Sequence, residues 1–191
     1  MSVFEYLGVL ISVVMGLGVT HILIGVSKTI HQRETVSVYW VQLAWAVNTL
    51  VYVIAVWWGM FWWSNLVQWS FFHFLFIIVY AIILFLLASL LFPWDLTSDF
   101  DFERHFFSNR RWFFGILFLA WCIDIPETVL KAQGGLRALP TAYVAWVSVL
   151  LVLSAIAGWT GNRRYHAFFA VFWLAWIIGY LSLTTLRVIV S

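Results

Sequence analysis

Two carboxylates and a proline within four positions of an apolar segment are the residues of this chain best suited to chemistry. The segment reads CIDIPE from Cys122 to Glu127. Inside a membrane an acid costs roughly 2.5 to 3.5 kcal/mol on insertion scales, so it should face protein or trapped water rather than lipid. Pro126 offers no N–H to the carbonyl of Cys122, and an oxygen freed in this way can serve a cation. The pattern favours a proton- or cation-binding site at Asp124.

The neighbours of the two acids predict different states for them. Asp124 and Glu127 are three residues apart and share a helix face, and Glu127 reaches Lys131 one turn later. Asp124 has no such local partner, so it must be protonated, hydrated or paired with another helix. Glu5, in the first apolar segment, is a candidate companion in an ion or proton site. Arg187, in the last, is a candidate ion-pair partner of either acid, so a binding site and a structural ion pair both stay open.

The composition indicates that the surroundings of these residues are lipid. Of 191 residues, 64% are apolar and 9% are charged, and mean hydropathy is +0.99. A water-exposed surface cannot carry so much contiguous apolar area. We therefore expect an integral membrane protein, located in the bacterial cytoplasmic (inner) membrane. The net charge of +2 gives no reason to expect nucleic acid as a partner.

Six apolar runs are each long enough to cross about 30 Å of hydrocarbon, so they predict an all-α, polytopic membrane protein with a single domain over residues 1–191. The predicted transmembrane helices cover residues 3–27, 38–61, 69–92, 112–131, 139–159 and 167–188, and residues 93–111 form the predicted cytoplasmic loop. With both termini outside, seven of the ten Lys and Arg residues lie inside. Because cytoplasmic loops are enriched in basic residues, we expect the N-terminus and the C-terminus both outside.

Aromatic and basic residues mark the expected membrane interfaces. Trp rings prefer the depth where apolar chains meet wet headgroups, and Arg binds anionic headgroups. The residues expected to contact lipid at the interface are Trp57, Trp58, Trp62, Trp63, Arg110, Arg111, Arg163 and Arg164. Anchoring is the ordinary role of such tryptophans. An aromatic cage for a lipid or a quaternary amine is the alternative.

His21 and Asn48 are polar side chains within apolar spans, where each needs a hydrogen-bond partner. Gly18 and Gly25 flank His21 at three and four residues and are expected to leave a notch beside the imidazole. A histidine hydrogen-bonded across helices is the favoured interpretation. Contact with haem or a quinone is the alternative, and no other cofactor is predicted. Asn48 is expected to join helices or to line a polar pathway.

Small residues recur at every fourth position of the first span, at Gly8, Ser12, Gly16 and Thr20. Such a ladder lets another helix approach closely, so we expect a packing seam there. So small a protomer would need partners to enclose a pathway. We therefore expect a homo-oligomer or a complex with another membrane protein, in contact with membrane lipids.

Signatures of catalysis are missing from the sequence. Cys122 is the only cysteine, which excludes an intrachain disulfide and a thiolate-clustered metal site. The sequence contains no HExxH motif, nucleophile elbow, phosphate-binding loop or dinucleotide fingerprint, so neither a metal site nor catalysis is predicted. The leading hypothesis is a small oligomeric channel or transporter-like protein with an acidic site in the outer half of the membrane. The alternative is a non-catalytic sensor or accessory subunit of a larger membrane complex, with its acids in structural ion pairs.

Overall fold

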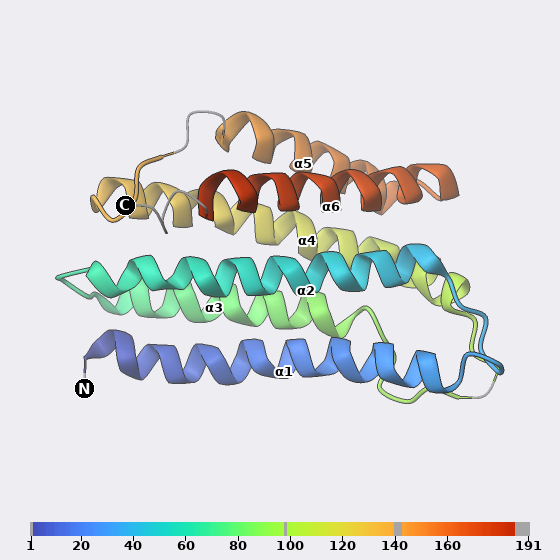
Figure 1. Ribbon diagram of the computed structural model, residues 1–191. Helices are drawn as coiled ribbons and strands as arrows, with labels where there is room; N and C mark the ends of the chain where they lie inside the picture. The colour runs from blue at the N-terminus through green and yellow to red at the C-terminus, as the bar shows by residue number, and fades with distance from the viewer. Residues whose placement is uncertain (1, 98, 140–142, 186–191) are drawn as a thin grey trace.

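The computed structural model describes residues 2–97, 99–139 and 143–185, and within these ranges the chain is helical apart from its connections and one isolated bridge between Ser37 and Asp101. The elements are α1 (Val3–His31), α2 (Trp40–Met60), the short 3-10 helix η1 (Phe61–Asn65), α3 (Phe71–Ser89), α4 (Phe102–Gln133), α5 (Tyr143–Trp159) and α6 (Arg163–Thr185). Successive α-helices run in opposite directions along one long axis. As a result α1 begins and α6 ends at the same end of the bundle (Figure 1).

The α-helices pack mainly in three pairs, α1 on α3, α4 on α5 and α2 on α6. Contacts of α3 with α4 and of α1 with α2 join these pairs into one bundle (Figure 1). Aromatic rings fill the space between α2, α4 and α6. The buried indole of Trp45 lies 5.1–5.5 Å from the rings of Phe113, Phe114 and Phe169. Edge-to-face ring contacts of this kind join α2, α4 and α6.

Four segments are long and apolar enough to cross a membrane: Val3–His31, Trp40–Asn65, Phe71–Ser89 and Phe102–Gln133. This supports an all-helical integral membrane protein. α5 is a shorter apolar helix of 17 residues. The six-span prediction also requires α5 and α6 to cross the membrane, and these two crossings stay a prediction.

The predicted cytoplasmic loop over residues 93–111 is wrong in its second half. α4 begins at Phe102, where the carboxylate of Asp101 accepts a hydrogen bond of 3.0 Å from the backbone N–H of Arg104. Phe102 and Phe106 are buried in the bundle. The helix therefore begins before its long apolar run, because an N-cap and the packing of an apolar face on the core stabilise its first turns.

The close packing of α1 lies on a different face from the predicted seam. A Cβ on Gly25 would lie 2.2 Å from Cγ of Phe92, and a Cβ on Gly18 would lie 3.3 Å from Cβ of Ala88. At Gly8 and Gly16 a Cβ would meet no atom within 4 Å. Within the described chain, Gly18 therefore admits α3 and Gly25 admits Phe92 of the segment that follows α3, whereas Gly8 and Gly16 are turned away from them.

Candidate functional site

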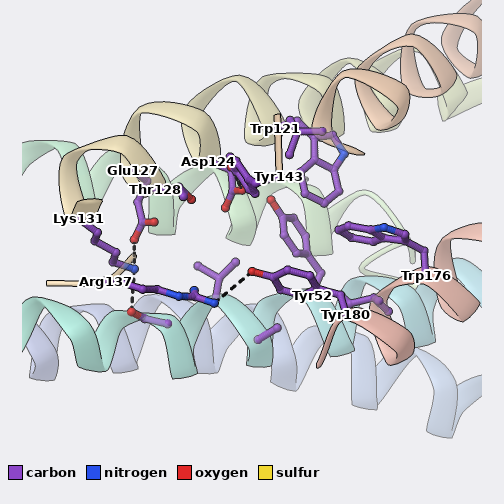
Figure 2. Close-up of a pocket in the computed structure, with 15 residues that line it drawn as sticks. Tyr52, Trp121, Asp124, Glu127, Thr128, Lys131, Arg137, Tyr143, Trp176 and Tyr180 are labelled. Carbon is purple, nitrogen blue, oxygen red and sulfur yellow. Dashed lines mark hydrogen bonds and ion pairs between the residues drawn. The ribbon is translucent and has the colours of Figure 1, made fainter. Parts of the chain in front are cut away.

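Polar side chains from four α-helices and one loop surround a cavity of about 90 Å³ in the bundle. Because water occupies about 30 Å³ per molecule in the liquid, this cavity has room for a few waters. The polar residues that line it are Tyr52, Asp124, Glu127, Thr128, Lys131, Arg137, Tyr143 and Tyr180, and Trp121 and Trp176 form part of its apolar wall. Figure 2 shows these side chains converging from α2, α4, α5, α6 and the loop after α4.

Asp124 is held by hydroxyl groups. The Tyr80 hydroxyl donates to Oδ1 at 2.8 Å and the Tyr143 hydroxyl donates to Oδ2 at 2.5 Å. The Tyr52 and Tyr80 hydroxyls lie 3.1 Å apart. A hydroxyl has one proton, so when Tyr80 donates to Asp124 it must accept from Tyr52. Asp124 is half-buried because it borders the cavity, and both of these hydrogen bonds come from hydroxyl groups rather than from a basic side chain.

The tyrosines place Asp124 deep in the bundle. Tyr80 is the tenth of the 19 residues of α3, and Tyr52 is the thirteenth of the 21 residues of α2. Both of these helices belong to segments apolar enough to cross a membrane. The hydrogen bond to Tyr80 therefore puts the carboxylate near the middle of α3, independently of where α4 enters the membrane.

Glu127 sits in a separate ion pair. Lys131 Nζ contacts Glu127 Oε1, and both side chains are buried. Trp63 Nε1 donates to the same carboxylate oxygen at 2.9 Å, and Lys131 Nζ donates to the carbonyl of Gly59 at 2.7 Å. The pair thus connects α4 to the end of α2 and to η1. These groups form a closed polar cluster that fixes the α2–α3 turn against α4.

Arg137 is the second cation on the cavity. Its Nη2 donates to the Tyr180 hydroxyl at 3.2 Å, and its guanidinium lies 5.8 Å from the centre of the Trp62 ring. Gly135, with φ of 69°, turns the chain after α4 and so directs Arg137 back toward the bundle. A left-handed backbone of this kind is easiest for glycine. Figure 2 shows the side chain extending along the cavity, below Asp124.

Two predicted partners of the acids are not part of this cluster. Glu5 is exposed, and its carboxylate accepts a hydrogen bond of 2.8 Å from the backbone N–H of Ser2 in a capping box at the start of α1. It does not line the cavity of Asp124. A first-turn acid completes the helix cap, which accounts for its position. The candidate ion-pair partner Arg187 lies outside the described residues.

The four tryptophans expected at the lipid interface differ in their exposure and in their contacts. Trp57 and Trp58 are half exposed on the bundle surface, which suits an interfacial position. Trp63, expected at the lipid interface, is instead buried against Glu127. A buried indole N–H needs a hydrogen-bond acceptor, and the Glu127 carboxylate provides one for Trp63 inside the bundle. Trp62 contacts Arg137 through its ring face.

The four arginines expected to bind lipid headgroups also differ from one another. Arg111 and Arg164 are exposed, and Arg110 is half-buried with Nη1 donating to the carbonyl of Phe107 at 2.5 Å. Arg163 contacts the carboxylate of Glu103 and so links the starts of α6 and α4. Such an exposed pair contributes little stability. None of these four residues borders the Asp124 cavity.

His21 and Asn48 both bond to backbone oxygens of other segments. His21 Nε2 lies 3.0 Å from the carbonyl of Phe92, and its ring lies 4.6 Å from that of Trp94. The Phe92 ring occupies the space beside Gly25, so the notch expected beside the imidazole is filled by protein. Asn48 Nδ2 donates to the carbonyl of Ala170 at 2.9 Å and thereby joins α2 to α6.

The sequence interpretation missed Tyr52, Tyr80, Tyr143 and Arg137. A signal was present for two of them, because tyrosine favours membrane interfaces and Tyr52 and Tyr80 lie well inside apolar runs. A hydroxyl at that depth requires a partner, and Asp124 was the unpaired acid. Arg137 gave no such signal, since its approach depends on the turn at Gly135.

Neither a metal-binding group nor a known relative supplies a role for the site. Among the residues that the structure describes, no three His, Cys, Asp or Glu side chains gather closely enough to hold a metal ion. Comparisons with protein-family models, with curated proteins and with solved structures find no match for this chain. The geometry of the Asp124 cavity is therefore the basis for a functional proposal.

Proposed function

We propose that this protein is a small, oligomeric channel or transporter-like membrane protein that binds and releases a proton at Asp124. One observation carries the proposal: the partners of this carboxyl group are tyrosine hydroxyls, and the group borders a cavity. A hydroxyl can donate to a carboxylate and accept from a carboxylic acid. Both protonation states of Asp124 can therefore be hydrogen-bonded by the same neighbours.

Glu127 differs from Asp124 in this respect. Its partners are the ammonium of Lys131 and the indole N–H of Trp63, which only donate. A proton on Glu127 would leave the buried Lys131 without its counter-charge, and an unpaired buried charge is costly. We therefore assign Glu127 a positioning role, in which it holds α4 against the α2–α3 turn, and not a proton-exchanging role.

A proton fits the cavity better than a metal cation does. Lys131 and Arg137 line the same space as Asp124, and both carry positive charge. A metal cation would have to enter against this charge with Asp124 as its only uncompensated ligand. A proton needs one acceptor and no coordination shell. Water in the cavity would connect Asp124 to the end of the bundle at which α4 ends.

The proposal includes six membrane crossings, with both termini outside and Asp124 in the outer half of the membrane of a bacterial cell. The alternating directions of the six α-helices support the even number of crossings (Figure 1). The ladder from Gly8 to Thr20 faces away from the rest of the chain, which supports its use between protomers. Membrane lipids and further copies of the chain are the proposed partners.

Proton flux into proteoliposomes, followed with a trapped pH-sensitive dye under an imposed potential, tests the proposal. We expect flux with the unaltered protein and at least a tenfold loss in Asp124→Asn, which keeps the size of the side chain but takes up no proton. Asp95→Asn is the matched control, since Asp95 is an exposed acid in the α3–α4 connection. Unchanged flux in Asp124→Asn, with folding verified by circular dichroism, would sink the site.

The second candidate is a non-catalytic sensor or accessory subunit, which the buried Glu127–Lys131 pair favours. Such a protein would use its acids only to fix helices, and it would conduct nothing. Absence of flux from the unaltered protein, together with co-purification of a stoichiometric membrane partner, would favour this candidate. In that case Asp124→Asn would weaken stability without changing any transport.

A further inference from the structure

A second hollow lies between α4 and α5, near the ends of these helices that are remote from Asp124. The pairing of Arg111 with Trp159 at one end and of Asp124 with Tyr143 at the other shows that α4 and α5 are antiparallel. The hollow has a volume of about 340 Å³ and is here named the α4–α5 groove. Its principal lining residues are Arg111, Gly115 and Phe118 of α4 and Ser154, Gly158 and Trp159 of α5.

The groove exists because glycines replace larger side chains along it. A Cβ on Gly115 would meet no atom within 4 Å, and a Cβ on Gly158 would meet only Cβ of Phe114, at 3.9 Å. Gly115, Phe118 and Trp159 are exposed. Since α4 is apolar enough to span a membrane, an open face at this position is a face toward lipid. The groove can therefore accept an acyl chain from the side.

Two polar groups in the groove lack a polar protein partner among the described residues. The Arg111 side chain is exposed, forms no ion pair or hydrogen bond with them, and has its guanidinium 5.9 Å from the centre of the Trp159 ring. Ser154 is 1% exposed, and its Oγ has no hydrogen-bond partner. A buried hydroxyl without a partner is unfavourable, so a ligand or water must reach it. One end of the groove thus offers a cation, and its interior offers a hydroxyl.

We propose that the α4–α5 groove binds one anionic phospholipid. The phosphate lies on the guanidinium of Arg111, the Ser154 hydroxyl donates to an ester carbonyl, and an acyl chain lies over Gly115. The depths agree with this assignment, because Ser154 is five residues, or about 7.5 Å of helix, from Trp159, and ester carbonyls lie just below the phosphate of a phospholipid. Trp112 and Trp159 at the same end mark an interfacial level. The positive charge of Arg111 selects an anionic headgroup.

Native mass spectrometry of the protein from bilayers of equal phosphatidylglycerol and phosphatidylcholine tests this proposal. We expect one tightly retained phosphatidylglycerol per chain. Arg111→Gln should weaken retention about fivefold, the factor that one basic residue contributes at an anionic surface. Gly115→Leu should abolish retention, since a Cβ at this position meets no atom within 4 Å and the leucine side chain would occupy the groove. Arg104→Gln and Gly179→Leu are the matched controls at exposed positions outside the groove, and both should retain the lipid.

A photoreactive phosphatidylglycerol with its label in the acyl chain gives a second measurement. We expect cross-links to α4 and α5 that Gly115→Leu removes while the protein keeps its helical circular dichroism spectrum. Equal retention of the two lipids would overturn the proposal in favour of ordinary surrounding lipid. Displacement by soluble glycerol phosphate would overturn it because no acyl chain would be needed, and cross-links to a second copy of the chain would overturn it because another helix would occupy the groove.

Discussion

Replacement of Lys131 by methionine tests the reasoning about the buried ion pair most directly. Methionine retains the apolar stem of the side chain but removes the ammonium, so packing changes little. Glu127 then keeps only the Trp63 N–H as a donor, and the carbonyl of Gly59 loses its contact with Nζ. Both members of the pair are about 95% buried, with residual exposures of 4% for Lys131 and 5% for Glu127. Bulk water therefore cannot replace the lost partner, and only the few waters of the cavity can approach the remaining carboxylate.

The expected magnitude follows from that burial. Removing one partner of a buried ion pair costs about 3 to 5 kcal/mol, because the remaining charge is left uncompensated. We expect Lys131→Met to lower the free energy of unfolding by this amount. In the double variant Glu127→Gln/Lys131→Met no charge remains to be stranded. It should therefore recover about 0.5 to 3 kcal/mol, the usual range of coupling between residues in contact.

Equilibrium unfolding in mixed micelles, with SDS as the denaturant and helical circular dichroism as the signal, measures these free energies. Lys28→Met is the matched control, since Lys28 donates one hydrogen bond of 3.1 Å to the carbonyl of Trp94 and forms no ion pair with the described residues. It should cost about 0.5 to 1.5 kcal/mol. If Lys131→Met costs no more than Lys28→Met, or if the effects of Glu127→Gln and Lys131→Met simply add, the account of this ion pair is wrong.

Three further predictions use the same unfolding measurement. When Asp124 is ionised, Tyr80→Phe and Tyr143→Phe should each cost about 1.5 to 3 kcal/mol because they remove hydrogen bonds to a carboxylate. Tyr52→Phe, which removes a bond between two hydroxyls, should cost about 0.5 to 1.5 kcal/mol; equal costs at high pH would contradict donation by Tyr80 and Tyr143 to a charged group. Gly25→Ala should cost about 1 to 3 kcal/mol, since its Cβ would overlap the Phe92 ring, while Gly8→Ala should stabilise by up to about 1 kcal/mol. Trp63→Phe should cost about 1.5 to 3 kcal/mol by removing the donor to Glu127, and Trp57→Phe, at an exposed ring, should have almost no effect.

The helical class of the fold could be predicted from hydropathy, and the error in α4 shows the limit of that signal. A helix surrounded by lipid needs a long run of apolar residues, which is visible in the sequence. Each predicted span accordingly corresponds to a helix in the structure. The first ten residues of α4 contain polar and charged side chains and so fall outside any such run. They are helical because Asp101 caps them and because Phe102 and Phe106 pack on the core. Burial of this kind depends on the tertiary arrangement.

The prediction of the α1 seam had a similar limit. Small residues lie on two faces of α1, four residues apart from Gly8 to Thr20 and seven apart at Gly18 and Gly25, and sequence alone cannot tell which face meets a neighbour. The structure uses the face of Gly18 and Gly25, against the end of α3 and the residues that follow it. What decides the choice is the position of Phe92 and Ala88, which lie about 70 residues away along the chain. The spacing of small residues therefore identifies candidates for close packing but not their partner.

Asp124 and Glu127 show why a candidate site cannot be assigned from helix spacing alone. Three residues apart, the two carboxyl groups share a face and line one cavity, and the sequence distinguishes them only by Lys131, one turn after Glu127. The α2–α3 turn supplies Trp63 and the carbonyl of Gly59, which complete an ion pair around Glu127, whereas α3 and α5 supply two hydroxyls to Asp124. Permanent donors stabilise only the ionised form, but hydroxyls serve either form. The chemistry of the partners, more than the depth of the acids, therefore separates a proton-exchanging carboxyl from a structural one.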